Sequence, residues 1–370
     1  MAMTKDQEMA VKLERLRKML DRLSLDAVYL KRQDNFGWLT CGGQNWLGFG
    51  EMGLCGLLVT KDSQYAITNL IEASRMRDEE HLEAMGFPIH AAVWYESKFE
   101  AETIEKLVPS GKVGADHPHP SGTNIAGEVQ LLRFSLTEAE VERYKELGFM
   151  VSRALEETIA EIHPGDTEFK TISRLITRSR EAGMDVVLAT CAGDDRISNH
   201  RHPIATENKI QKRVQLSSNM RWKGIIVCAT RNRSFVPLPV ELKEQYRKNV
   251  EIDCTIMASS IPGNTFVSAL EAGKAAYEAR GYAEDFKKHH QGGPIGYMIR
   301  EFRVDFDTPG NIHENQAFCW NPSLTGTKSE DTIIATSNGV VPVSRAVICP
   351  TMTLEVNGQT FVRPDIWETY

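Results

Sequence analysis

The chain has 370 residues, of which 41% are hydrophobic and 25% are charged, and its formal net charge is −7. This length accommodates two domains, and the composition is that of an ordinary globular protein. The acidic balance argues against nucleic acid or an anionic membrane surface as the main partner, because either would need a basic face.

The N-terminus and the cysteines bear on where the protein works. The first residues are acidic and lack an apolar core, and no stretch approaches ~18 consecutive apolar residues, so neither a secretory signal nor a membrane span is expected. The seven cysteines form no C-x-x-C pair and are odd in number, which indicates free thiols in a reducing compartment. We therefore expect a cytoplasmic protein that acts on a small-molecule substrate.

The first third of the chain predicts a small α/β domain. Apolar residues near helical spacing predict a helix over residues 7–23, and a short apolar strand follows at 27–30. Two further strands, at 56–60 and 65–68, are joined by a short polar turn. This alternation of a helix, a strand and a hairpin is typical of an α/β domain, which we place at residues 1–136.

A second domain is predicted over residues 137–370. Thr137, followed three residues later by Glu140, has the form of a capping box and begins a long helix that runs to about Ile162. A Pro-Gly pair then ends this helix, and Thr167 begins the next one. The remaining residues alternate helices with strand hairpins and contain no low-complexity tract or short-period repeat.

Several short strings, in this order, resemble the creatinase, prolidase and aminopeptidase P family. They are Arg15-Leu16, Ala27-Val28-Tyr29, Asn35, Trp38-Leu39-Thr40, Leu136-Thr137-Glu138 and Ile162-His163-Pro164-Gly165. The resemblance covers nearly the whole chain. It implies a creatinase-like N-terminal domain followed by a pita-bread domain, in which two α-β-β halves close around a central site.

The resemblance also assigns the positions of the family's metal ligands. The peptidases of the family hold two metal ions through two Asp, one His and two Glu, and oxygen-rich ligands of this kind suit hard divalent ions. The corresponding residues here are Ser217, Cys228, Gly293, Asn321 and Glu330. Glu330 alone keeps a carboxylate, and without balancing negative charge the binding of two divalent cations is unfavourable. We therefore expect no metal and no other cofactor.

A histidine segment is the first candidate for chemistry. Some relatives, creatinase among them, hydrolyse small C–N compounds without metal and use a histidine as the acid–base group. His202 matches that histidine if a loop is shortened by two residues, and His200 is the other choice. A neutral imidazole accepts a proton from water near pH 7 and returns it to a leaving nitrogen. The alternative is a pair of loop histidines on a polar surface.

The string from His289 to Gly293 is the second candidate. Paired glycines beside His289 and His290 suggest close backbone approach to a ligand or to another strand. The alternative is a helix end, with the basic run from Lys287 complementing the helix dipole and Gly292 as the stop. Arg300 falls where the peptidases carry a substrate-contacting histidine, and it would either clamp a substrate carboxylate or form an ion pair across a strand.

Two more residues at ligand positions have competing interpretations. A thiol is reactive only when a cation or a helix N-terminus lowers its pKa, and Cys228 lies in the apolar strand 225–229, so a buried inert cysteine is favoured. Glu330 needs a cation, which is either a cationic substrate or, in a buried salt bridge, Arg231 or Arg300.

These residues together predict a metal-independent, creatinase-like hydrolase, or a lyase, that acts on a C–N bond of a small amidine, amide or amino-acid-like compound. The expected catalytic residues are His202, Glu330 and His200; the expected substrate-binding residues are Arg300, His289, His290, Arg231, Asn321 and Cys228. Two alternatives stay open. One is an Xaa-Pro metallopeptidase, and the other is a catalytically inactive pita-bread domain that binds a peptide or protein, as a similar domain of a histone chaperone does.

The resemblance further implies a homodimer in which the first domain of one subunit borders the pocket of the other. The loop 45–50 is rich in aromatic residues and glycine and has no core periodicity. Exposed aromatic residues of this kind often belong to an interface or a binding site, so we expect Trp46 and Phe49 to be exposed.

Overall fold

The computed structural model describes residues 3–48, 50–109 and 111–370, and this part of the chain separates into two compact units. The first consists of Met1–Ala139 with Lys223–Ile225, and the second of Glu140–Trp222 with Ile226–Tyr370. Among the described residues, no helix combines the length and the apolar character needed to cross a bilayer. All seven cysteines are buried, and none of them forms a disulfide bond among the described residues.

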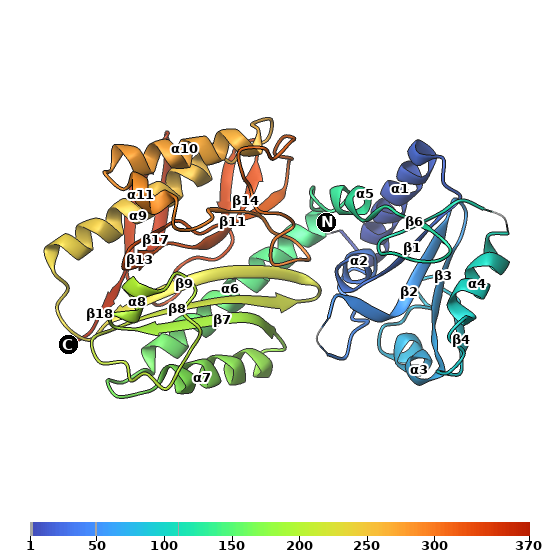
Figure 1. The fold of residues 1–370 in the computed structure, drawn as a ribbon, viewed down its shortest axis with the longest axis horizontal. Coiled ribbons are helices and arrows are strands. Elements are labelled where there is room, and N and C mark those ends of the chain that lie inside the picture. Colours follow the sequence, from blue (N-terminus) through green and yellow to red (C-terminus); the bar gives the residue numbers. More distant parts are fainter. Residues whose placement is uncertain (1–2, 49, 110) are drawn as a thin grey trace. The chain divides into compact units, whose positions relative to one another are not determined.

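The first unit is built on a mixed sheet with the strand order β4-β3-β2-β1-β5-β6 (Figure 1). Its strands are β1 (Ala27–Arg32), β2 (Met52–Thr60), β3 (Gln64–Asn69), β4 (Ile89–Ala92), β5 (Val113–Ala115) and β6 (Thr123–Asn124). Its helices are α1 (Lys5–Leu23), α2 (Gln33–Leu39), α3 (Leu70–Asp78), α4 (Phe99–Leu107) and α5 (Ala126–Leu131). The expected helix, strand and hairpin are therefore present.

Local chemistry explains where α1 begins and which of its faces is buried. Thr4 accepts a hydrogen bond from the backbone N–H of Gln7, whose side chain in turn accepts from the backbone of Thr4. This reciprocal capping box satisfies two donors that the first helical turn leaves without intrahelical partners. Leu16 and Leu20 lie on the buried face, four residues apart, as the predicted amphipathic pattern requires.

The loop at 45–50 differs from its expected state. Trp46 is only 7% exposed, so its interpretation as an exposed interface residue is wrong. Asn45 is also buried and donates to the backbone oxygen of Cys55, which holds the loop against strand β2. Leu47 is the apolar side chain that the loop exposes, while Phe49 lies outside the described residues.

The second unit contains two four-stranded sheets, ordered β18-β9-β8-β7 and β10-β11-β14-β15, and two short hairpins, β12-β13 and β16-β17. The strands are β7 (Asp185–Gly193), β8 (Arg213–Trp222), β9 (Ile225–Ser234), β10 (Gly292–Pro294), β11 (Gln316–Trp320), β12 (Ser323–Leu324), β13 (Thr327–Lys328), β14 (Asp331–Thr336), β15 (Gly339–Pro342), β16 (Thr351–Val356), β17 (Gln359–Pro364) and β18 (Trp367–Glu368).

Helices accompany these sheets, as Figure 1 shows. They are α6 (Glu138–Ala160), α7 (Glu168–Glu181), α8 (Arg196–Asn199), α9 (Val240–Ser259), α10 (Phe266–Ala279) and α11 (Ala283–Phe286). The predicted long helix is thus α6, and Thr167 caps α7 by accepting from the backbone of Lys170. A core that includes Val250, Phe318 and Trp320 joins α9 and α10 to strands of the second sheet.

In the segment from Lys287 to Pro294, Gly292 is not the stop of a helix, which was one of its two expected roles. Helix α11 stops at Phe286, and Gly292 begins strand β10 instead of ending a helix. A Cβ atom at Gly292 would lie 2.3 Å from the backbone oxygen of Cys319 on strand β11. The glycine is therefore required by the close approach of another strand, which is one of the two roles expected for the glycine pair.

Candidate functional site

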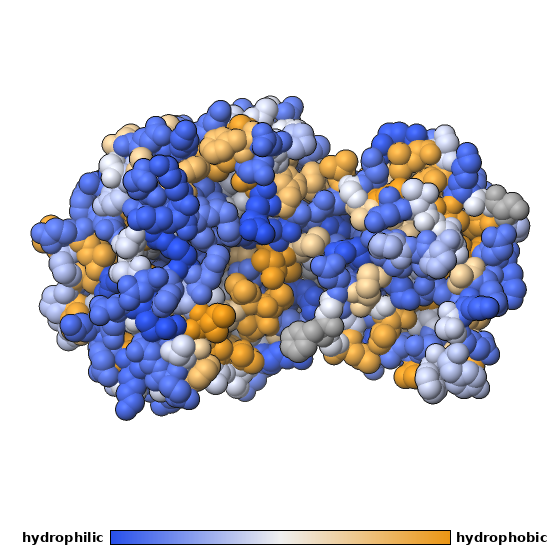
Figure 2. Space-filling view, viewed as in Figure 1, coloured by the Kyte–Doolittle hydropathy of each residue, from blue (hydrophilic) through white to orange (hydrophobic). Residues whose placement is uncertain are grey.

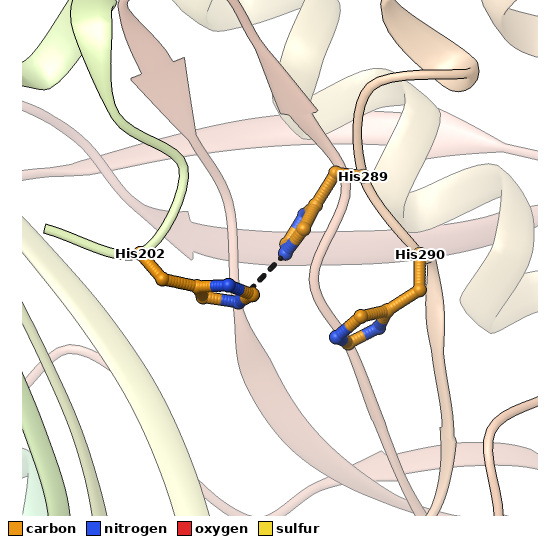
Figure 3. Close-up of side chains that lie close together, drawn as sticks. All are labelled: His202, His289 and His290. Carbon is orange, nitrogen blue, oxygen red and sulfur yellow. Dashed lines mark hydrogen bonds between the residues drawn. The ribbon is translucent and has the colours of Figure 1, made fainter.

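Three histidines from two separate segments lie close together in the second unit (Figure 3). His202 lies in the loop after α8, and His289 and His290 precede strand β10. Nε2 of His202 is 3.0 Å from Nε2 of His289, and the ring centroids of His289 and His290 are 4.6 Å apart. His289 is buried while His202 is exposed, so His202 is the member of the group that faces solvent.

Hydrogen bonds restrict the tautomers of the His202–His289 pair. One of the two Nε2 atoms must carry the shared proton, because two lone pairs cannot face each other at this distance. Nδ1 of His289 lies 3.2 Å from Oγ of Ser323 on strand β12. If Nδ1 of His289 donates to Ser323, its Nε2 accepts from His202, and Nδ1 of His202 is then left as a free base.

Glu330 is surrounded by positive charge. Nζ of Lys328 lies 2.8 Å from one carboxylate oxygen of Glu330, and Nη2 of Arg300 lies 3.6 Å from the other. Thr230 on strand β9 donates a further hydrogen bond of 2.7 Å to Glu330 and is itself 2.6 Å from Oγ of Ser217. Burial by itself would raise the pKa of Glu330, but Lys328 and Arg300 outweigh it and lower this pKa to about 2.

The same charges act on the three imidazoles. Burial lowers the pKa of His289 to about 2 and of His290 to about 4; the charge of Lys328 reinforces this effect at His289, and the charge of Arg300 does so at His290. The pKa of His202 is lowered too, first by burial and then by Lys328. All three rings are therefore neutral near pH 7, the state in which an imidazole accepts a proton.

Cys228 is buried, as expected, but its surroundings are not purely apolar. Its sulfur accepts a hydrogen bond of 3.5 Å from Arg300. Burial raises the pKa of the Cys228 thiol, yet a hydrogen bond from Cys319 and the charge of Arg300 bring the net shift downward. Burial raises the pKa of Cys319 well above its usual range, and its thiol donates to Oε1 of Glu330 at 3.6 Å.

Two groups of side chains in the described residues have the ligand types and spacing to hold a metal ion. The ring nitrogens of His202, His289 and His290 lie within 4.8 Å of one another. The second group, in the first unit, combines Glu100 with the histidines at 117 and 119. There His119 accepts from a backbone N–H and pairs with Glu100, which also binds Lys31, so these partners explain the second group as a polar network.

The other expected site residues lie in different surroundings. Arg231 does not pair with Glu330; its guanidinium instead binds Glu156 and Asp331 at 2.8 and 2.9 Å, so that interpretation of Arg231 is wrong. Asn321 is buried, and its Oδ1 has no hydrogen-bond partner among the described residues. His200 is exposed at the end of α8.

Sequence reasoning missed Lys328 and Ser323 as members of the site. Lys328 belongs to the same short string as Glu330: it ends strand β13, and Glu330 lies two residues further on, just before strand β14. Residues at i and i+2 of extended chain point to the same side, so the spacing carried a signal for this ion pair. Ser323 gave no comparable signal, because it meets His289 only through the fold.

Known proteins share this architecture. No protein-family model matches the chain. An uncharacterized peptidase, YqhT from Bacillus subtilis, is 22% identical over 356 residues, which cover 89% of this chain and 96% of the relative. An Xaa-Pro dipeptidase from Bacillus anthracis superposes with a TM-score of 0.75 at 22% identity, covering 92% of this chain and 98% of that one.

Two other solved structures have the same fold. An X-Pro aminopeptidase from Thermotoga maritima gives a TM-score of 0.76 at 18% identity and covers 96% of this chain and 99% of its own. The N-terminal domain of the FACT complex subunit SPT16 from chickpea gives 0.67 at 14% identity, with coverages of 90% and 96%. The chain therefore has the two-domain architecture, with a C-terminal pita-bread domain, of the creatinase, prolidase and aminopeptidase P family.

Proposed function

We propose that the protein is a hydrolase of a peptide or amide C–N bond in a small peptide-like or amino-acid-like compound. The observation that carries this proposal is the exposed His202, hydrogen-bonded to the buried His289 and lying in the field of the Lys328–Glu330 pair. A base that is neutral near pH 7, a second imidazole that orients it and charged groups beside it can together serve acid–base hydrolysis of this bond.

The proposed mechanism gives each residue one role. Nδ1 of His202 takes a proton from the attacking water, while its Nε2–H donates to His289 and fixes the ring. The same ring then returns the proton to the leaving nitrogen, so acid and base steps balance. Glu330 orients the substrate or the water, and Arg300 anchors an acidic group of the substrate.

We also propose that this chemistry needs no metal ion. The carboxylate at the remaining ligand position, Glu330, already has an ammonium at 2.8 Å and a guanidinium at 3.6 Å, and a metal ion would have to displace both. The hydroxyl of Ser217 is used by Thr230, and Gly293 offers no side chain. These neighbours do not fit a pair of divalent cations held by five ligands.

The Xaa-Pro metallopeptidase is the second candidate function, and the comparisons favour it. The solved structures with this fold include an Xaa-Pro dipeptidase and an X-Pro aminopeptidase, and the curated relative is described as a peptidase. These names support a peptide bond as the scissile bond, which both candidates share. The resemblance to the SPT16 domain keeps open the third possibility, a domain that binds protein without catalysis.

Metal content and peptide hydrolysis, measured together, separate these candidates. The purified protein is to be assayed on a panel of Xaa-Pro and other dipeptides and of small amides, with and without a chelator, after elemental analysis. We expect less than one equivalent of zinc, manganese or cobalt and turnover that survives the chelator. Stoichiometric metal with chelator-sensitive Xaa-Pro cleavage would establish the metallopeptidase, and no turnover on any substrate would favour the binding domain.

A further inference from the structure

The charges that face the three histidines do not balance. Lys328, Arg300 and Arg303 are the cations whose fields act on His202, and Glu330 is the anion that acts on the same ring. Each imidazole is neutral near pH 7, for the reasons given above. The group therefore carries more positive than negative charge, even if the exposed Arg303 is left out.

Two of these cations are buried beyond what a single carboxylate satisfies. The side chain of Lys328 is 8% exposed and that of Arg300 is 13% exposed. An ammonium has three N–H donors, and the carboxylate of Glu330 accepts from one of them at 2.8 Å. Nε of Arg300 is buried and has no hydrogen-bond partner among the described residues. A buried net charge with spare donors is costly unless a further anion joins it.

The nature of the missing partner follows from these donors. Guanidinium and ammonium groups bind carboxylate or phosphate oxygens through short, charge-assisted hydrogen bonds. A cationic compound, such as an amidine, would meet like charge from Lys328 and Arg300, and the one carboxylate that would hold it is already paired with both. The excess positive charge therefore disfavours binding of the cationic amidines that were among the substrates expected from the sequence.

We infer that the histidine site takes a substrate bearing a carboxylate, held between Lys328 and Arg300, and that it rejects cationic amidines. The inference rests on the proposed function only in calling the ligand a substrate, because the charge preference is measured without turnover. Lys328 acts here as a binding residue for the anionic group, and the carboxylate of Glu330 holds its ammonium in place.

An isosteric set of probes tests the charge preference directly. Acetate, acetamide and acetamidinium have nearly the same planar shape and carry negative, zero and positive charge. Each is titrated into the full chain at fixed pH and ionic strength, and the histidine ring signals are followed by NMR. We expect acetate to shift the signals of His202 and His290, whereas acetamidinium leaves them unchanged at the same concentration. His90, on strand β4 of the first unit, is the internal control.

Two variants move the charge of the site in opposite directions, and a third serves as the control. Lys328→Met removes the net positive charge, so we expect acetate to bind at least about tenfold more weakly. Glu330→Gln adds to it, and we expect tighter binding. Lys287→Met changes an exposed lysine, with 69% of its side chain accessible, and should alter nothing.

Two results would overturn the inference: acetamidinium shifting the His202 signal at or below the concentrations at which acetate does, or acetate affinity unchanged in a folded Lys328→Met protein. If Lys328→Met does not fold, the comparison of the three probes on the unmodified protein still decides. A protein that binds acetate as expected but hydrolyses no compound would disprove the proposed function and leave the charge preference standing.

Discussion

At the scale of single residues, the His202–His289 pair determines what the site can do. The two rings share one proton across 3.0 Å, and His289 is held from behind by Ser323. The buried ring of His289 orients the exposed ring of His202 through this hydrogen bond. A general base in an active site is positioned in the same way. His202 is thus the residue whose removal is most informative.

Replacement of His202 by alanine should lower kcat by 10²–10⁴-fold, the usual loss when a positioned acid–base group is removed. The fold should persist, because His202 is exposed and adds little to the core. Cys228→Ser is the matched variant: it changes a buried thiol assigned a packing role, and we expect most activity to remain. Once a substrate is identified, both are assayed side by side, and a dead Cys228→Ser with an active His202→Ala would mean thiol chemistry.

The pH dependence of kcat/KM should report the same histidine. Burial and then Lys328 lower the pKa of His202 below its ordinary 6.5. Since the neutral ring is the working form, activity should be lost only as pH falls through this lowered pKa, so the acidic limb lies below pH 6.5. Lys328→Met removes one cation and should move that limb to higher pH. A limb at or above pH 6.5 in the unmodified protein would contradict the assignment.

Single residues also show what the sequence can and cannot reveal. The pairing of Glu330 with Arg300 was one of the expected alternatives, and it is present. The pairing with Arg231 was not realised, because Glu156 on α6 and Asp331 on β14 lie closer to that guanidinium in the fold. Neither partner is near Arg231 in sequence, so only tertiary structure selects between these salt bridges.

At the scale of elements, boundaries set by local chemistry were predictable and those set by packing were not. Thr167 caps α7 as its sequence predicts, because an N-cap depends on its own first turn. Gly292 was open to two interpretations, since a glycine after a basic helix end and a glycine in a crowded strand look alike in sequence. The backbone of β11 decides for the strand.

Gly148 provides a test of packing against propensity within helix α6. Alanine normally stabilises a helix by about 1 kcal/mol relative to glycine. A Cβ atom at Gly148 would lie 2.2 Å from the backbone oxygen of Val343, so Gly148→Ala should instead destabilise the protein by about 1–3 kcal/mol.

Gly127 in helix α5 is the control for this substitution, because a Cβ atom there would meet nothing within 4 Å. Gly127→Ala should leave stability unchanged or raise it slightly. Urea denaturation followed by circular dichroism measures both variants. Equal changes in the free energy of unfolding for the two substitutions would show that the close contact between α6 and Val343 does not affect stability.

At the scale of the whole molecule, the surface presented in Figure 2 is largely hydrophilic and interrupted by apolar patches. Strand β7 lies at the edge of its sheet and exposes Val187 and Leu188, which are 38% and 44% accessible. An exposed edge strand with apolar side chains is a site for pairing with another chain unless something covers it.

We expect the protein to be a homodimer, as the resemblance to the creatinase, prolidase and aminopeptidase P family implies. One chain has a mass of 41.5 kDa, and light scattering at micromolar concentration should give twice that mass. Val187→Lys would introduce charge at an exposed position of β7 and tests whether this edge takes part. A monomeric mass for the unmodified protein would show that the expectation is wrong, whatever the variant does.

Gly293, which the resemblance places at the position of the family's histidine ligand, leaves no room for a side chain. A Cβ atom at this position would lie 2.7 Å from the backbone oxygen of Phe302 and 3.1 Å from Cγ2 of Val304. Any larger residue, histidine included, therefore requires the neighbouring backbone to move first. A single substitution therefore does not suffice to place a histidine at this position, and an engineer who wishes to build a metal site here must redesign the segment around residues 302–304 before the ligand itself.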